Sequence, residues 1–302
     1  MANASSGHKL GQVIGDWFEE CFVFPLLQKV GEELDLFVDT RFVTRSSRNN
    51  KIIWIDLDDN KVDYDAVLEI GGSPTKQGVP VAFLECFWRR GSRHSKDKAR
   101  DDSGKLMPMR ETYPTARFLG IIAAGDFTVP ARELIKSRDI DLFYVVKSKI
   151  IEAFSNCGLT MDYDDKLNED EKSLIVNKFV EDFTKSKKIE VKKELLKIIG
   201  TTTMDGYVNR IKSALSALPQ EIRIILRKSS EPIVFESVEE TSNFIKDPNF
   251  NIEVTEQSFV YEVTYSDGTE FAKELDTLEQ LKKLHEEIEM LENHMISLNL
   301  KS

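Results

Sequence analysis

Residues 63–102 read DYDAVLEIGGSPTKQGVPVAFLECFWRRGSRHSKDKARDD. The stretch holds two strand-like apolar runs, and each carries a carboxylate: Asp65 at the start of the first run and Glu85 inside the second. A Gly-Gly-Ser-Pro break at 71–74 separates the runs. If the two strands pair as a hairpin, both carboxylates face one edge of the sheet.

Two carboxylates on neighbouring strands predict a site for a hard cation. Mg²⁺ prefers oxygen ligands and keeps several waters, so Asp65, Glu85 and the backbone carbonyl of Cys86 form a sufficient set. Glu85 lies within VAFLECFW, where an unpaired carboxylate would be costly. Such a metal can activate water and stabilise charge on a phosphodiester. Asp63 and Glu69 share the strand face of Asp65 and are alternative ligands.

A basic segment follows the second strand and predicts contacts with phosphates. Between residues 88 and 100, six basic residues stand against one acid, Asp97. The predicted phosphate-binding residues are Arg89, Arg90, Arg93, His94, Lys96 and Arg100. The net charge of −11 argues against broad affinity for nucleic acid, but a local basic patch can still bind a polyanion.

The same segment offers one candidate for the chemistry itself. His94, Lys98 and Asp101 are spaced to share one face of a helix. We therefore expect Lys98 to point at the metal site, where it can position water or offset charge in the transition state.

Periodicity along residues 1–158 predicts a mixed α/β fold, with a mixed sheet and helices on both faces. The expected elements are a helix over 10–38 interrupted at Pro25, strands at 51–57, 62–70 and 79–88, a helix at 92–107, a strand at 118–124, a helix at 130–137, a strand at 142–146 and a helix at 148–154.

The remaining chain divides into a helical linker or subdomain over 159–220 and a small α+β region over 221–302. Residues 222–245 and 261–284 have a similar order of elements, which suggests a repeated strand–strand–helix unit. A stripe of apolar residues near the C-terminus either packs on its own domain or forms a dimer seam. The stripe consists of Leu281, Leu284, Ile288, Leu291, Met295 and Leu298.

Several classes of protein are disfavoured by the composition of the 302 residues. The three cysteines, Cys21, Cys86 and Cys157, are scattered, so neither a disulfide framework nor a zinc knuckle is expected. No apolar run reaches the roughly 18 residues of a membrane helix, and the N-terminus lacks the apolar region of a secretory signal. Without a glycine-rich P-loop, no nucleotide cofactor is expected. We expect a cytoplasmic protein that does not bind membranes.

The spacing of Asp65 and Glu85, together with the basic helix after them, resembles the PD-(D/E)xK nuclease superfamily. PVAFLECFWRRGSRHSKDKARDD followed by FLGIIAAGDFT resembles restriction-endonuclease-like proteins more narrowly, and the likeness covers roughly residues 10–156. It implies a restriction-endonuclease-like core and Mg²⁺-dependent hydrolysis of double-stranded DNA, as in type II restriction enzymes. Cleavage of both strands of a palindrome favours a two-fold homodimer.

The resemblance also implies roles for individual residues. Asp65 and Glu85 match the two metal-binding acids, and a first-helix acid often joins them. Glu20 is predicted for that role, with Glu19 and Glu33 as alternatives.

The third motif position departs from the pattern, because it is Phe87 and not Lys. Lys98 is the predicted replacement, with Lys96, Arg89 and Arg90 as alternatives. Without a replacement, the chain would be a non-catalytic DNA-binding or phage-defence subunit. A third hypothesis is a protein-interaction module that uses the acidic C-terminal half.

Overall fold

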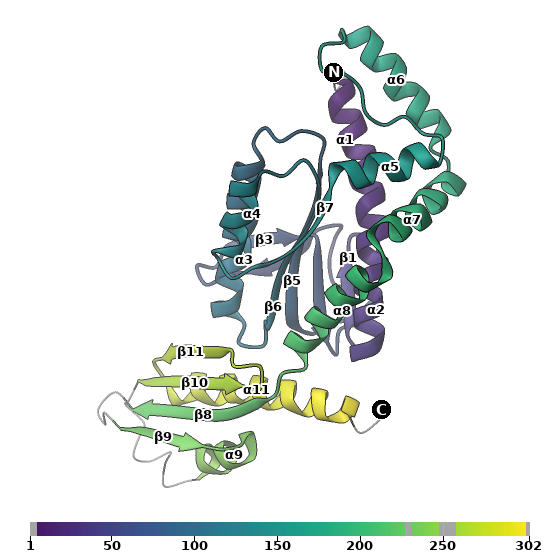
Figure 1. The fold of residues 1–302 in the computed structure, drawn as a ribbon. Helices are drawn as coiled ribbons and strands as arrows, with labels where there is room; N and C mark the ends of the chain where they lie inside the picture. The colour runs from purple at the N-terminus through teal and green to yellow at the C-terminus, as the bar shows by residue number, and fades with distance from the viewer. Residues whose placement is uncertain (1–4, 227–230, 248–249, 251–257, 300–302) are drawn as a thin grey trace.

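The computed structural model describes residues 5–226, 231–247, 250 and 258–299, and its centre is a mixed five-stranded sheet (Figure 1). The strand order is β1-β4-β5-β6-β7. β1, β4 and β5 pair antiparallel, whereas β5, β6 and β7 run parallel. The strands are β1 Phe37–Thr40, β4 Ala66–Ile70, β5 Val79–Arg89, β6 Phe118–Gly125 and β7 Asp141–Val146. The predicted mixed α/β class is confirmed.

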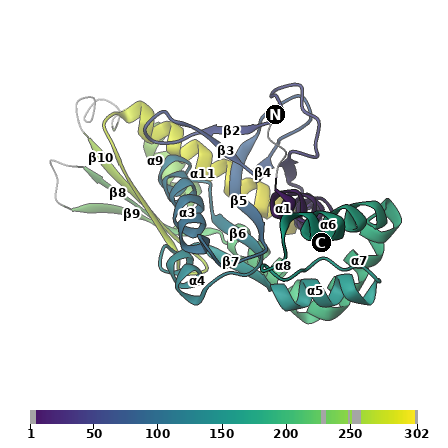
Figure 2. The same cartoon turned by 90° about the horizontal axis from the view of Figure 1, so that it is seen from above.

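Helices cover both faces of this sheet (Figures 1 and 2). One face carries α3 Ser95–Thr112 and α4 Val129–Lys136. The other face is covered by α1 Ser6–Trp17, the π-helix η1 Phe18–Val23, α2 Phe24–Leu34, α5 Lys147–Asn156 and α8 Thr201–Leu215, and α7 Lys185–Ile199 packs on these helices. Consequently β5 is buried on both sides: Phe83 and Phe87 join one core cluster, and Leu84 and Cys86 the other.

The predicted strand over 62–70 is two strands in different sheets. β3 Lys61–Tyr64 pairs with β2 Ile52–Ile55 in a separate two-stranded ribbon, while β4 belongs to the main sheet. Asp65 is the single residue between them. The ribbon packs Trp54 and Tyr64 against Phe83 of β5.

The first predicted helix ends earlier than expected and is followed by a strand that the sequence reading missed. Asp35 adopts a left-handed conformation (φ 49°) and ends α2, and β1 then pairs with β4. Pro25 does not interrupt the helical path, because it lies in the first turn of α2, where its missing N–H is tolerated.

The end of β5 is held close to β6 by Gly125. This residue has a φ of +103°, and a Cβ atom there would lie 1.9 Å from the carbonyl oxygen of Arg89. The next residue, Asp126, donates its backbone N–H to that same oxygen at 2.8 Å. Only glycine fits this approach, which fixes where the chain leaves the sheet after Arg89.

Helices of the middle region pack on the sheet domain. α6 Glu169–Asp182 lies against α1, and α7 lies against α5. Phe183 contacts the rings of Trp17 and Phe154, so the middle region shares the N-terminal core. The domain boundaries at 158 and 220 stay predictions.

The C-terminal unit repeats strand–strand–helix, as the sequence suggested. Its sheet has the order β11-β10-β8-β9. The elements are β8 Pro219–Leu226, β9 Pro232–Phe235, α9 Val238–Lys246, β10 Phe259–Tyr265, β11 Glu270–Leu275 and α11 Leu278–Asn299. Five residues of the apolar stripe of α11 are buried in the core of the chain itself, and Leu298 is partly buried, which favours packing on its own domain over a dimer seam.

Polar side chains attach the C-terminal unit to the rest of the protein. Arg117 pairs with Asp267 at 3.2 Å. Lys273 Nζ donates to the carbonyl of Glu111 at 3.0 Å, and His294 Nε2 lies 2.9 Å from the carbonyl of Leu34.

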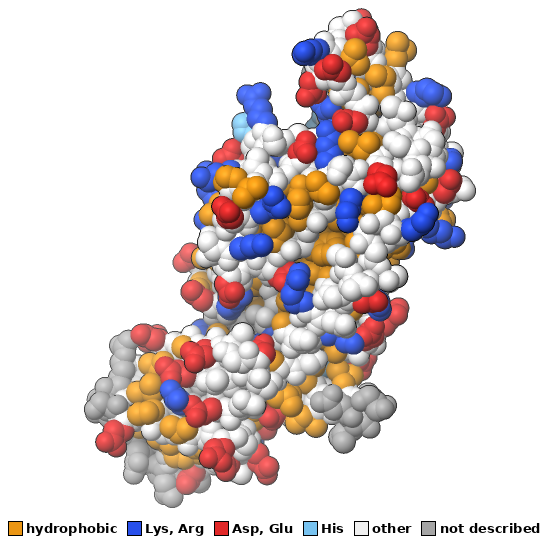
Figure 3. All heavy atoms as spheres, in the orientation of Figure 1, with side chains coloured by type: hydrophobic (Ala, Val, Ile, Leu, Met, Phe, Trp, Pro, Cys, Tyr) orange, Lys and Arg blue, Asp and Glu red, His pale blue; other side chains and the backbone are white. Residues whose placement is uncertain are grey.

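Charge is unevenly distributed over the surface. Figure 3 shows mainly Asp and Glu on the visible face of the C-terminal unit, and Lys and Arg among hydrophobic side chains over the central region. Among the described residues, no helix is both long and apolar enough to cross a membrane.

Candidate active site

Asp65 and Glu85 come together where β4 and β5 begin to separate. Ala66 pairs with Leu84, so Asp65 and Glu85 stand opposite each other one position further along. The backbone N–H of Cys86 donates to Asp65 Oδ2 at 2.7 Å, which fixes this carboxylate beside β5. Glu85 is 2% exposed. The hairpin arrangement expected of these two acids is therefore present.

Glu19 is the acid that the first helical segment brings to this pair. It lies in η1, and Arg41 Nε contacts its Oε2 at 2.8 Å. Burial, followed by the negative charge of Asp65, raises the pKa of Glu19 to about 7. Single-turn π-helices occur often at functional sites, because they re-aim side chains within an otherwise regular helix.

Glu20, the predicted first-helix acid, does not join the cluster. Its side chain is 51% exposed and lies 3.7 Å from Lys188 of α7. Glu19 and Glu20 are consecutive residues of a helical turn, so their side chains leave the helix in different directions. The alternative Glu33 pairs with Lys212 of α8. The structure thus places Glu19, and not Glu20, next to Asp65.

Two lysines of α3 approach the carboxylates. Lys105 Nζ lies 3.1 Å from Glu85 Oε2 and 3.3 Å from Oε1. Lys98 Nζ contacts Asp102 Oδ1 at 2.6 Å, and its charge also lowers the pKa of both Asp65 and Glu85 against the effect of burial. The predicted Lys98 is therefore near the site, but Lys105 is the direct partner of Glu85.

Phe87, at the position where the resemblance implies a lysine, contacts Lys98. Lys98 Nζ lies 5.4 Å from the centroid of the Phe87 ring. The ring itself packs on Phe127 in the core beneath α3 and α4. The side chain of Phe87 thus points towards α3, and the cation that it contacts is Lys98 of that helix.

Burial dominates the electrostatics of the site. It raises the pKa of Glu85 to about 8, with repulsion from Asp65 as the next cause. Burial also raises the pKa of Asp65 and that of Asp102. Within the described chain, Asp102 Oδ2 is buried without a hydrogen-bond partner. The cluster therefore favours proton uptake or a bound cation.

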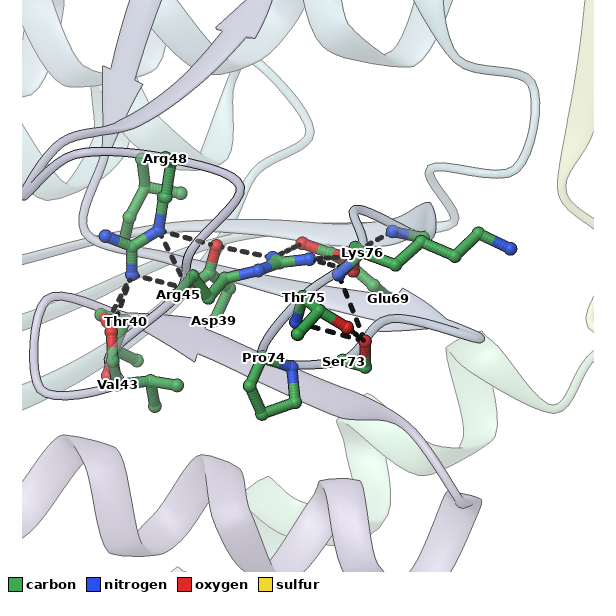
Figure 4. Close-up of polar contacts among 12 residues, drawn as sticks. Asp39, Thr40, Val43, Arg45, Arg48, Glu69, Ser73, Pro74, Thr75 and Lys76 are labelled. Carbon is green, nitrogen blue, oxygen red and sulfur yellow. Dashed lines mark hydrogen bonds and ion pairs between the residues drawn. The ribbon is translucent and has the colours of Figure 1, made fainter.

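The alternative ligands Asp63 and Glu69 are engaged elsewhere. Asp63 Oδ1 accepts the N–H of Ile52 at 2.9 Å, inside the β2–β3 ribbon. Glu69 is fully buried and forms a two-point ion pair with Arg45, at 2.6 and 3.1 Å (Figure 4). Neither carboxylate is among the charges that shift the pKa of Glu85.

The predicted phosphate-binding residues divide into engaged and available groups. Arg90 is engaged: it stacks 4.2 Å from the Tyr163 ring and pairs with Asp162 and Asp165. His94 contacts Asp97 at 3.1 Å, and Arg100 pairs with Asp97 and Asp101, all at exposed positions. Arg89, Arg93 and Lys96 have no carboxylate partner within the part of the chain that the structure describes.

The Asp65–Glu85 pair suits Mg²⁺ by the chemistry of its donors. Two carboxylates and a carbonyl, here that of Cys86, are hard oxygen ligands, and Mg²⁺ completes its shell with water or phosphate. The raised pKa of Glu85 comes first from burial and then from repulsion by Asp65, and a divalent ion would offset both effects. Among the described residues, no group of three or more His, Cys, Asp or Glu side chains is arranged to hold a metal by itself.

Comparisons with known proteins do not identify a family. No protein-family model matches the chain, and no curated protein matches it. A solved structure, that of the protein of unknown function AF1548, covers 64% of this chain and 98% of its own, with 14% sequence identity and a TM-score of 0.29. A likeness at that score carries no argument about fold or function.

Proposed function

We propose that this protein is a Mg²⁺-dependent DNA endonuclease of the PD-(D/E)xK type, similar to type II restriction enzymes. The observation that carries the proposal is the pairing of Asp65 with the buried Glu85, with Lys105 in contact. The sheet order β1-β4-β5-β6-β7 between flanking helices supports a restriction-endonuclease-like core. The three free cysteines agree with a reducing, cytoplasmic setting.

Each residue of the cluster has a role that follows from its surroundings. Asp65, Glu85 and the carbonyl of Cys86 would hold Mg²⁺, which supplies a Lewis acid for water and the phosphodiester. Lys105 offsets the charge of Glu85 and can orient a water molecule. Glu19, whose pKa lies near 7, can accept or return a proton at neutral pH.

Double-stranded DNA is the proposed substrate, and a second copy of the chain the proposed partner. Arg89, Arg93 and Lys96 are the cations with the least competition for phosphate, and His94 and Arg100 flank them. Arg90 joins them only if Asp162 and Asp165 release it. Two cleavage sites related by a two-fold axis would cut both strands of a symmetric sequence.

A second candidate is a DNA-binding subunit that does not cleave. Phe87 at the lysine position favours it, since the motif cation is then missing from β5. The contact of Lys105 with Glu85 favours the nuclease, because it restores a cation beside the second acid.

The test is incubation of the purified protein with a panel of plasmid and phage DNA, with Mg²⁺ or with EDTA, beside Asp65→Asn. Discrete fragments that need both Mg²⁺ and Asp65 are expected. Binding without cleavage, weakened by salt, would move the assignment to the second candidate. Metal-dependent cleavage that is unchanged in Asp65→Asn would refute the proposed site.

A further inference from the structure

A pocket of about 440 Å³ lies between the loop over 41–51 and the β2–β3 ribbon, outside the carboxylate cluster. Ligand pockets usually measure 300–1,000 Å³, so its size suits a small organic group. The consecutive residues Ile52, Ile53 and Trp54 of β2 line the pocket. Their side chains point alternately to the buried and the exposed face of the ribbon. Within the part of the chain that the structure describes, β2 pairs only with β3, and the pocket lies along this ribbon.

The wall formed by the loop is fixed by a buried ion-pair network (Figure 4). Arg45, with a 1% exposed side chain, binds Asp39 at 2.7 Å and Glu69 at 2.6 Å. Arg48 binds the other oxygen of Asp39 at 2.6 Å and also the carbonyls of Thr40 and Val43. Two cations and two carboxylates are matched, so the loop is anchored before any ligand arrives.

The charge that remains at the pocket is positive. Four lining residues are cations and only one, Asp39, is an acid, which both arginines already contact. Lys51 is 71% exposed and lies 3.6 Å from Asp63. Lys61 has no ion-pair partner among the residues that the structure describes. An anionic ligand is therefore favoured over a neutral or cationic one.

The pocket is also lined by amide and apolar side chains, which suit an organic group attached to the anion. Asn49 and Gln77 carry side-chain amides, each with donors and an acceptor, as the edge of a nucleobase requires. Ile52, Ile53 and Trp54 provide an apolar wall. Trp54 Nε1 is a buried donor without a partner in the described chain, so a small shift of this ring on binding would satisfy it.

We infer that this pocket binds a nucleoside phosphate, with its phosphate at Lys51 and Lys61 and its base against the amides and apolar wall. Resting on the proposed nuclease function, the inference places a nucleotide of the DNA strand beside the cleavage site. Lys61 and Asp65 are joined by one extended segment about 13 Å long. Asp63 links the two sites, because it contacts Lys51 while its carbonyl oxygen lies 3.5 Å from Lys105 Nζ.

The test is calorimetric titration in EDTA, without cleavage, using the four deoxynucleoside 5′-monophosphates, inorganic phosphate and a single-stranded 12-mer. At least one nucleotide is expected to bind tighter than phosphate. The double variant Lys51→Ala/Lys61→Ala should weaken it by about 10-fold or more, since two charge-assisted contacts are lost. Lys185→Ala/Lys193→Ala, which removes two exposed lysines of α7, is the matched control and should bind as wild type.

No nucleotide binding, equal binding of phosphate, or an equal loss in the control would overturn the inference. Competition by the 12-mer assigns the pocket to a nucleotide within a strand, and nucleotide binding without competition assigns it to a free nucleotide. Glu85→Gln separates this inference from the proposed function: it should abolish cleavage and leave nucleotide binding intact.

Discussion

Lys105 Nζ lies 3.1 Å from Glu85 Oε2, although Lys105 belongs to the third turn of α3 and Glu85 to the middle of β5. The contact joins the helix to the sheet at a buried acid of the candidate site. Burial of Glu85 raises its pKa to about 8, and Lys105 acts in the opposite direction. In the proposed nuclease site, α3 would therefore supply the cation that Phe87 of β5 cannot provide.

Replacement of Lys105 by Ala is expected to slow DNA cleavage by roughly 100-fold, the usual effect of removing one group that stabilises transition-state charge. Single-turnover cleavage at saturating protein measures this directly. Lys98→Ala is expected to slow cleavage less and to destabilise the fold by about 1–3 kcal/mol, because Asp102 would remain buried without its partner. A larger kinetic loss in Lys98→Ala than in Lys105→Ala would reverse the assignment.

The sequence predicted Lys98 but not Lys105, because the face of α3 that meets the sheet depends on where the helix begins. The helix begins at Ser95 after a left-handed His94, so Lys98, Asp102 and Lys105 share the face towards the sheet. The predicted face, through His94, Lys98 and Asp101, differs from the face that meets the sheet. The signal available in the sequence was the spacing of Lys98, Asp102 and Lys105, which places an acid between two lysines on one helical face.

Continuous apolar runs made β5 and β6 predictable from the sequence. The pairing of Asp65 with Glu85 was predictable because it depends on β5 forming a hairpin with the strand before it. Other features depend on long-range packing. β1 has only four residues and is defined by its pairing with β4. Arg90 pairs with Asp162, which lies 72 positions away in the sequence. The residues around Arg90 therefore predict phosphate binding, although the fold provides an internal carboxylate partner.

Glu19→Gln is expected to weaken metal-dependent cleavage by about 10-fold or more, as when a group that supports metal ligands is lost, whereas Glu20→Gln should have little effect. Glu19 lies beside Asp65, and Glu20 faces Lys188 at the surface. The pair is a matched control, since both variants remove one carboxylate from neighbouring positions of η1. Equal losses, measured as initial rates at several Mg²⁺ concentrations, would show that the orientation of η1 does not decide the site.

Mg²⁺ binding is expected to release protons at neutral pH. Glu85, with a pKa of about 8, and Glu19, with a pKa of about 7, are largely or partly protonated at pH 7, and metal binding requires the carboxylate form. Apparent affinity should therefore rise between pH 6 and 8 and level off above about pH 9. Titration calorimetry in two buffers with different heats of ionisation measures the protons, and buffer-independent heats at pH 7 would contradict the raised pKa values.

The C-terminal unit is expected to lose stability as pH falls from about 6.5 to about 4. Its buried His285 lies between Tyr261 Oη at 2.8 Å and Ser242 Oγ at 2.7 Å. Burial lowers the pKa of His285 to about 4, below its ordinary value of 6.5. The folded state thus disfavours the charged ring, so this stability is present above pH 6.5 and lost as pH falls through 4. The contribution of His285 to the free energy of unfolding is on the order of 3 kcal/mol.

His285→Gln keeps a donor and an acceptor but does not titrate in this window. The difference in unfolding free energy between wild type and variant, measured by urea denaturation from pH 4 to 8, should shrink at the acidic end. A constant difference across the range would show that His285 does not titrate on unfolding.

The most direct test of the nuclease is single-turnover cleavage by Glu85→Gln beside wild type, on a DNA that the wild type cuts with Mg²⁺. The variant keeps the size of the side chain but cannot offer a charged oxygen to a metal. We predict a rate at least about 1,000-fold below wild type, with unchanged DNA binding and an intact fold by circular dichroism. Cleavage at the wild-type rate by the folded variant would contradict the account, because the metal would then be held elsewhere.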